Sequence, residues 1–178
     1  MLHFILGAAK SGKSAHAEHL VADMPGATVY IGTLPSGSLC GERILRHRLR
    51  RPASWHLIEL RGNPETDITL LEGALDKYRN ILLDGFTFYV FQLISTFDFE
   101  FTILKDKVTS LIRKFANHSG EVVVVDQPVV GIYPARLRLA LRYLHLLLAQ
   151  SAHTLTLIES GRAIPLGRRE LSTPNRRG

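Results

Sequence analysis

The chain has 178 residues, of which 46% are hydrophobic and 21% charged, so it suits one folded domain with a sizeable core. Cys40 is the single cysteine, which excludes an internal disulfide and a zinc cluster built from thiolates, and fits a reducing cytoplasm. No apolar run approaches the ~20 residues that a membrane-spanning helix needs. We therefore expect a cytoplasmic protein without a membrane span.

The net charge of +6 predicts attraction to anions, which include nucleotides, nucleic acids and acidic lipids. The arginines are concentrated in two segments, residues 43–51 and 168–177. We interpret the second segment as part of a solvated, frayed end. The predicted organisation is a single domain over residues 1–166 followed by a basic, flexible tail over residues 167–178.

Apolar runs alternate with amphipathic stretches along the chain. We expect strands at residues 2–6, 27–31, 55–60, 80–83, 121–125 and 155–158. We expect helices at residues 14–24, 42–51, 68–77, 102–118 and 134–150. Residues 86–97 fit either a helix or a strand, and the segment from Gly161 onward is assigned no element. The alternation predicts an α/β fold with a mostly parallel sheet covered by helices on both faces.

One octapeptide lies between the first expected strand and the first expected helix. It is Gly7-Ala8-Ala9-Lys10-Ser11-Gly12-Lys13-Ser14, and it fits the phosphate-binding pattern G-x-x-x-x-G-K-[ST], the P-loop. Its glycines let backbone N–H groups turn toward phosphate oxygens, and the following helix presents its positive end. Lys13 would reach the β- and γ-phosphates, and the Ser14 hydroxyl would bind Mg²⁺. The sequence therefore predicts a P-loop NTPase-type fold that binds ATP or GTP.

An acidic residue is expected near this loop, because P-loop proteins place an acid on Mg²⁺ from a neighbouring strand. Asp84 follows the apolar run Ile81-Leu82-Leu83 and is the favoured candidate. Asp126, after residues 121–125, is the competing acid. A purely structural alternative is that Asp84 caps the next helix.

Several short motifs have an order and spacing that resemble one enzyme family. They are the P-loop continued as Ala15-His16-Ala17-Glu18, Tyr30-Ile31-Gly32-Thr33, Arg43-Ile44-x-x-His47, Arg51-Pro52-Ala53-x-Trp55 with Glu59, Leu82-Leu83-Asp84 with Thr87, and Gly131-Ile132-x-Pro134. They resemble the bifunctional adenosylcobinamide kinase/adenosylcobinamide-phosphate guanylyltransferases of cobalamin assembly. The resemblance is close from Met1 to about Ile94 and loose from Glu121 to Gly161.

This resemblance implies a P-loop domain that phosphorylates the aminopropanol hydroxyl of adenosylcobinamide and then transfers GMP from GTP to that phosphate. It implies that Gly7–Ser14 cradle the triphosphate, that Lys13 is catalytic, and that His47 becomes guanylylated. It also implies a guanine nucleotide site lined by Gly32, Thr33, Leu34, Arg48, Leu49, Arg50, Arg51, Glu59 and Asp84. Mg²⁺, bound by Ser14 and Asp84, and assembly as a trimer are implied as well.

The chain departs from the family pattern at identifiable positions. Arg46 stands where the family usually has a second histidine, and Gln92 where it usually has asparagine. Asp126-Gln127-Pro128-Val129 replaces the usual Asn-Glu-Val-Gly, and Leu141-Arg142-Tyr143-Leu144 lacks the acid of a Phe-Arg-Asp run. We therefore expect nucleotide binding to be better preserved than corrinoid chemistry.

Two alternatives to the bifunctional enzyme follow from the residues. The departures at 126–128 and 141–150 would also fit a diverged protein that binds GTP or ATP without the two activities. The arginines of residues 43–51 would fit binding to a nucleic-acid backbone. We favour this second alternative least, because no aromatic residues are interleaved with those arginines and no nucleic-acid-binding motif is recognised.

Overall fold

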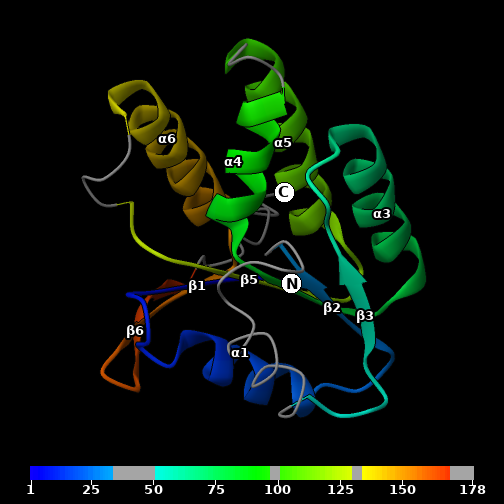
Figure 1. The fold of residues 1–178 in the computed structure, drawn as a ribbon. Coiled ribbons are helices and arrows are strands. Elements are labelled where there is room, and N and C mark those ends of the chain that lie inside the picture. Colours follow the sequence, from blue (N-terminus) through cyan, green and yellow to red (C-terminus); the bar gives the residue numbers. More distant parts are fainter. Residues whose placement is uncertain (34–50, 97–100, 130–133, 169–178) are drawn as a thin grey trace, which may run out of the picture.

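The computed structural model describes residues 1–33, 51–96, 101–129 and 134–168, which build one seven-stranded sheet with helices on both faces (Figure 1). The strands are β1 (Leu2–Gly7), β2 (Thr28–Gly32), β3 (His56–Glu59), β4 (Asn80–Asp84), β5 (Glu121–Asp126), β6 (Thr154–Glu159) and β7 (Arg162–Arg168). Their order is β3-β2-β4-β5-β1-β6-β7, and only the β6–β7 pair is antiparallel. The predicted α/β class with a mostly parallel sheet is confirmed.

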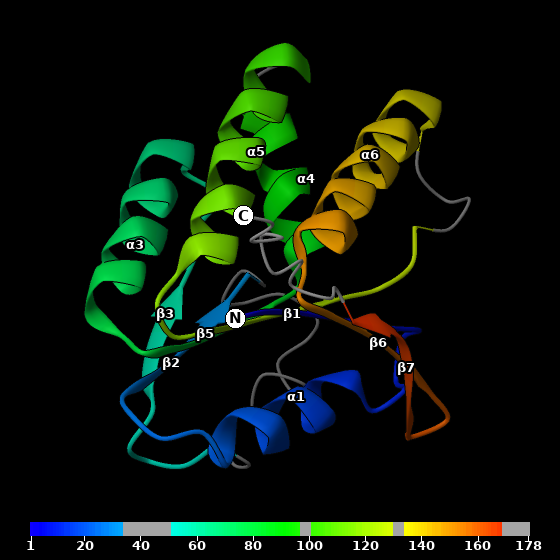
Figure 2. The same cartoon turned by 180° about the vertical axis from the view of Figure 1, so that it is seen from behind.

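The helices lie in two unequal layers. Helix α1 (Lys13–Ala22) covers one face of the sheet, and four helices cover the other face (Figures 1 and 2). These four are α3 (Pro64–Lys77), α4 (Phe86–Thr96), α5 (Phe101–Asn117) and α6 (Ala135–Ser151). Alternate strand residues enter two separate cores, because successive side chains of a strand point to opposite faces. Val122 and Val124 pack in the core under α3–α6, whereas Val123 and Val125 pack in the core next to α1.

The structure settles one open local prediction, corrects a second, and leaves a third almost wholly outside the described residues. Residues 86–97 fitted a helix or a strand, and residues 86–96 form helix α4. Helix α3 begins at Pro64, four residues before the expected start, because Asn63 Oδ1 accepts a hydrogen bond from Thr66 N and caps the helix. Of the helix expected at 42–51, all but Arg51 lies outside the described residues.

The segment after Gly161, which was assigned no element, forms strand β7. Ser160 and Gly161 both have positive φ, at 49° and 78°, and close a tight hairpin from β6 into β7. Pro165 and Gly167 obscure the strand pattern in the sequence, yet an edge strand tolerates both residues. Within the described residues, none of the helices is long and apolar enough to cross a bilayer.

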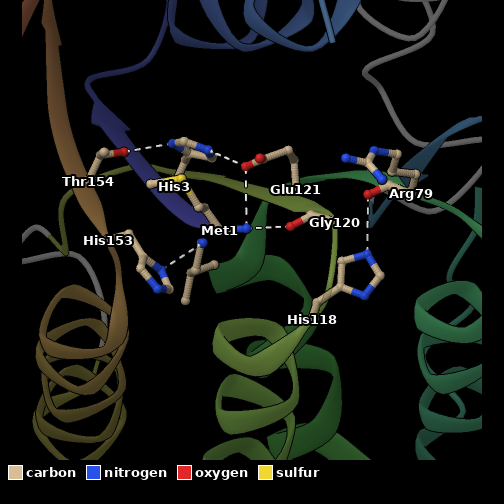
Figure 3. Close-up of polar contacts among 9 residues, drawn as sticks. Met1, His3, Arg79, His118, Gly120, Glu121, His153 and Thr154 are labelled. Atoms are coloured by element: carbon tan, nitrogen blue, oxygen red, sulfur yellow. Dashed lines mark hydrogen bonds and ion pairs between the residues drawn. The ribbon is translucent and has the colours of Figure 1, made fainter. Parts of the chain in front are cut away.

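A cluster of polar side chains connects the amino-terminal ends of three neighbouring strands, at the edge of the sheet opposite the P-loop (Figure 3). The imidazole of His3 on β1 bonds Thr154 Oγ1 on β6 and Glu121 Oε2 on β5, both at 2.8 Å. Burial raises the pKa of Glu121, but hydrogen bonds and charges from His3 and the Met1 amino group more than offset this, so its pKa is lowered. The cluster fixes the register of β5, β1 and β6, and therefore the positions where these strands end.

Candidate functional site

The predicted phosphate loop connects the carboxyl end of β1 to the start of α1. Lys10 and Gly12 adopt positive φ angles of 62° and 95°, which turn the loop back over the strand end. Gly12 is the N-cap of α1, no side chain caps the helix, and its first turn carries no acidic residue. The first N–H groups of α1 therefore face the loop without a carboxylate from the helix's own first turn to compete for them, which suits phosphate binding.

Packing around the loop explains the need for glycine at position 7. A Cβ at Gly7 would lie 2.4 Å from Ser11 Oγ and 2.8 Å from the backbone oxygen of Ile158. The β6–β7 turn supports the loop from the other side, since Gly161 N donates to Ser11 O at 2.9 Å. Ser11 Oγ is buried and has no hydrogen-bond partner among the described residues. A phosphate oxygen would satisfy that hydroxyl, so the loop fits an anionic ligand.

The two residues expected to handle phosphates and metal are buried at the start of α1. Lys13 is 6% exposed and Ser14 is 9% exposed. Lys13 Nζ donates to Ala8 O at 3.1 Å, which holds the ammonium across the loop. Both side chains therefore lie at the base of the loop.

Asp84 ends β4 and lies in a row with two other predicted residues. Backbone pairing places Gly32 beside both Glu59 and Asp84. The Asp84 carboxylate, 6% exposed, accepts a hydrogen bond from Tyr30 OH at 3.0 Å. Tyr30 packs in the core next to α1, so Asp84 points to the face of the sheet that carries the P-loop helix.

Thr33 and Tyr30 hold in place the turn that the chain makes at Asp84 and Gly85. Thr33 Oγ1 lies 3.0 Å from Asp84 O and 2.9 Å from Gly85 O. Burial is the largest cause, and the charge of Asp84 the second, of a Tyr30 pKa that lies well above its ordinary value. The charge of Arg51 acts in the opposite direction and lowers this pKa. The Arg51 guanidinium carbon lies 3.7 Å from the centre of the Tyr30 ring. The tyrosine therefore stays neutral, donates to Asp84, and links it to a predicted arginine.

Asp126 belongs to the opposite face and performs the capping that was considered for Asp84. Its Oδ2 accepts hydrogen bonds from Thr87 N at 2.7 Å, Thr87 Oγ1 at 2.8 Å and His145 Nε2 at 2.8 Å. Thr87 lies in the first turn of α4, so Asp126 satisfies the start of that helix across the chain. The structure thus separates the two acids, with Asp84 toward α1 and Asp126 toward α4 and α6.

The carboxyl ends of β1 and β5 form the point where the sheet connections diverge. These strands are neighbours, with Leu6 paired to Asp126. The chain leaves β1 toward α1 on one face and leaves β5 toward α6 on the other (Figure 1). In open parallel sheets, ligands bind in the crevice that such a divergence creates. The P-loop and Asp126 border this crevice from its two sides.

The structure therefore brings most of the predicted site residues to one edge of the sheet. Gly7–Ser14, Gly32, Thr33, Glu59 and Asp84 all lie at the carboxyl ends of strands, and Arg51 reaches them through Tyr30. Five further predicted residues, Leu34, His47, Arg48, Leu49 and Arg50, lie outside the described residues.

Other histidines occupy peripheral positions. His56 is exposed on edge strand β3, with its ring 5.0 Å from that of Tyr78. His19 on α1 is exposed, whereas His16 is half-buried. Burial and the neighbouring His19 lower the pKa of His16.

Two polar residues near the site were missed by sequence reasoning. Tyr30 was noted only as part of a motif, and nothing in the sequence shows that its hydroxyl reaches Asp84. His145 left a usable signal, because it occupies a core-facing position of α6 together with Leu141, Leu144 and Leu148. A lone histidine in such a stripe requires a polar partner inside the protein.

Comparison with known proteins agrees with this geometry. Residues 3–166 match the family model described as cobinamide kinase / cobinamide phosphate guanyltransferase. The chain is similar to the bifunctional adenosylcobalamin biosynthesis protein CobP of Pseudomonas aeruginosa strain PAO1, with 30% identity over 174 residues. That alignment covers 93% of this chain and 97% of the relative. The chain therefore belongs to the cobinamide kinase / cobinamide phosphate guanyltransferase family.

Proposed function

We propose that this chain phosphorylates adenosylcobinamide and then transfers GMP from GTP to the resulting adenosylcobinamide phosphate. The observation that carries the proposal is the P-loop, with its uncapped helix start and its unpartnered buried Ser11 hydroxyl, in a chain of this family. Phosphoryl and nucleotidyl transfer both need a site that neutralises a triphosphate, and this loop supplies backbone donors and Lys13 for that purpose.

In this proposal Lys13 contacts the β- and γ-phosphates of ATP or GTP, while Ser14 and Asp84 hold Mg²⁺. Bound Mg²⁺ would neutralise charge on the phosphates during transfer. No three His, Cys, Asp or Glu side chains of the described residues are grouped to hold a metal. A site of few protein ligands suits Mg²⁺, which usually keeps several waters and takes phosphate oxygens as ligands.

The remaining predicted residues would shape the nucleotide site around Asp84. Gly32 on the middle strand pairs with Glu59 on one side and with Asp84 on the other, and Thr33 holds the turn at Asp84. Arg51 is fixed on Tyr30 at the same edge. We assign to this group, with Leu34, Arg48, Leu49 and Arg50, the binding of the guanine nucleotide.

GMP transfer is proposed to use His47. Its neutral imidazole would attack the α-phosphorus of GTP, forming an N–P bond as the bond to pyrophosphate breaks. An oxygen of cobinamide phosphate would then displace the imidazole, forming the new phosphoanhydride and returning His47. Splitting one transfer into two displacements is the role of such covalent catalysis.

The experiment is incubation of the purified protein with α-labelled GTP and Mg²⁺, followed by a search for an acid-labile, base-stable adduct. Label should appear on the wild type and disappear in His47→Ala and in Lys13→Ala. His118→Gln serves as a matched control, because His118 lies at the opposite edge of the sheet (Figure 3). An unlabelled wild type that still binds GTP through Lys13 would instead support the diverged nucleotide-binding protein.

Assembly and location remain predictions. A trimer follows from the family resemblance, and light scattering of the purified chain tests it. In the apolar run Leu144–Leu148 of α6, Leu144 and Leu148 are fully buried, whereas Leu146 is 57% exposed. A cytoplasmic location is proposed from the sequence, and fractionation of cells tests it.

A further inference from the structure

A buried cluster on β5, α4 and α6 carries an inference beyond the proposed nucleotide site. Asp126 is 1% exposed, and its carboxylate is surrounded by four hydrogen-bond donors. Three are described above, and the fourth is Gln127 N, which donates to Oδ1 at 2.8 Å. A carboxylate accepts all four bonds without conflict, and the start of α4 adds a favourable dipole.

The hydrogen-bond pattern fixes the tautomer of His145. Its Nε2 lies 2.8 Å from Asp126 Oδ2 and 3.2 Å from Thr87 Oγ1. The Thr87 hydroxyl already donates to Asp126, so both neighbours of Nε2 are acceptors and Nε2 carries the proton. In the neutral imidazole Nδ1 is then the acceptor, and it has no hydrogen-bond partner among the described residues.

The surroundings of His145 hold the ring but leave it accessible. Phe4 on β1 meets it edge-on with ring centres 5.7 Å apart, and Phe86 on α4 lies 6.5 Å away. The His145 side chain is 13% exposed. Asp126 is the ionisable group among these contacts, and Arg142, one turn earlier on α6, is exposed. The ring therefore has one fixed orientation, one anionic partner and one nitrogen left for a ligand.

Position connects this imidazole to phosphoryl transfer. Asp126 pairs with Leu6, the residue directly before the P-loop, and β5 lies between β1 and the strand that ends in Asp84. The cluster thus borders the crevice from the face opposite α1. Among the described residues of this cluster, His145 is the ionisable side chain with an unpartnered nitrogen, and it lies on the face of the sheet opposite α1.

We propose that His145 accepts the proton of the acceptor hydroxyl during phosphoryl transfer, and that Asp126 is its positioning residue; this inference rests on the proposed kinase function. The hydroxyl oxygen forms a bond to the γ-phosphorus while the bond to the nucleoside diphosphate breaks, and the hydroxyl proton moves to Nδ1. The resulting imidazolium is paired with the Asp126 carboxylate, and the proton later passes to water. A carboxylate that holds one imidazole nitrogen while the other takes a proton is an established arrangement in catalysis.

The test follows phosphate transfer from γ-labelled ATP or GTP to adenosylcobinamide between pH 5.5 and 9. It compares the wild type with His145→Gln, Asp126→Asn and the control His118→Gln, and it measures the Kd of a fluorescent nucleotide for each. We expect kcat/KM of His145→Gln to fall about 10²-fold or more, which is the usual contribution of a general base. The decline of kcat/KM toward acid pH, which is the acid limb of the pH profile, should be absent in His145→Gln. The nucleotide Kd of this variant should change less than about twofold.

Asp126→Asn should also lower kcat/KM and shift the acid limb, because an amide can donate to the imidazole and reverse its tautomer. His145→Gln with a rate within about threefold of the wild type, or with an unchanged acid limb, would overturn the proposal. Should that variant not fold, a wild-type kcat/KM that does not change between pH 5.5 and 8 would by itself overturn the proposal. A wild type without any Lys13-dependent transfer would instead overturn the proposed function, and with it this inference.

Discussion

Two buried tyrosines should respond in opposite directions to the loss of their hydroxyl groups. Tyr30 is 7% exposed and its hydroxyl donates to the buried carboxylate of Asp84 at 3.0 Å. Tyr89 on α4 is fully buried, and its hydroxyl has no hydrogen-bond partner among the described residues. Replacement by phenylalanine keeps both rings, so the comparison isolates the hydroxyl groups.

The expected magnitudes follow from what each hydroxyl touches. A hydrogen bond to a charged group contributes about 1.5–3 kcal/mol, so Tyr30→Phe should reduce the free energy of unfolding by about 2 kcal/mol. A buried hydroxyl without a partner destabilises the fold by about 1–3 kcal/mol, so Tyr89→Phe should raise the free energy of unfolding by about 1 kcal/mol. At roughly 2–4 °C per kcal/mol for a chain of this size, Tm should fall by about 4–8 °C in the first variant and rise by about 2–4 °C in the second.

Urea denaturation of both variants at pH 7 is the assay, with equal m-values required for the comparison. Tyr78→Phe is the matched control, because the Tyr78 hydroxyl makes no hydrogen bond within the described part of the chain and, unlike that of Tyr89, is not among its fully buried unpartnered atoms, so stability should change little. Equal destabilisation by Tyr30→Phe and Tyr89→Phe would refute the reasoning, since it would show that hydrogen bonding of the hydroxyl does not decide the sign.

Three further predictions concern other parts of the sheet. Gly7→Ala should weaken nucleotide binding and lower stability by about 1–3 kcal/mol, since its Cβ would meet Ser11 and a backbone oxygen; titration calorimetry and thermal melting check this. The folded-state pKa of Glu121 is lowered, so wild type should be more stable than Glu121→Gln above about pH 5. That difference should vanish as pH falls through the lowered pKa, as acid titration of Tm will test. Asn80→Ala should lower the urea midpoint, because the fully buried Asn80 amide donates to Thr28 Oγ1.

Features that depend on local pattern could be predicted from the sequence. The P-loop is contiguous, and its spacing alone places a strand before it and a helix after it. The run of valines 122–125 has a composition that fits a fully buried parallel strand, and all four side chains are 0% exposed. These predictions needed no knowledge of which strands are neighbours.

Features that depend on strand order and on the face of the sheet could not be predicted. Asp84 and Asp126 both follow apolar strands, so their sequence contexts are equivalent. Their difference arises because Asp84 pairs with Val125, so Asp126 lies one residue farther along the sheet and its side chain points to the opposite face. Strand β7 was missed for another reason, since its pairing with β6 stabilises a segment whose own propensities are weak.

The change at position 126 also bears on whether the chain has lost its chemistry. The family that the sequence resembles usually has asparagine there, and a buried aspartate without partners would cost several kcal/mol. Here the carboxylate accepts four hydrogen bonds, from Thr87, Gln127 and His145, so the charge is stabilised by donors from two helices and its own strand end. The Asp126 carboxylate is therefore fully hydrogen-bonded in its place beside the P-loop, which favours a remodelled acceptor side of the crevice over a lost one.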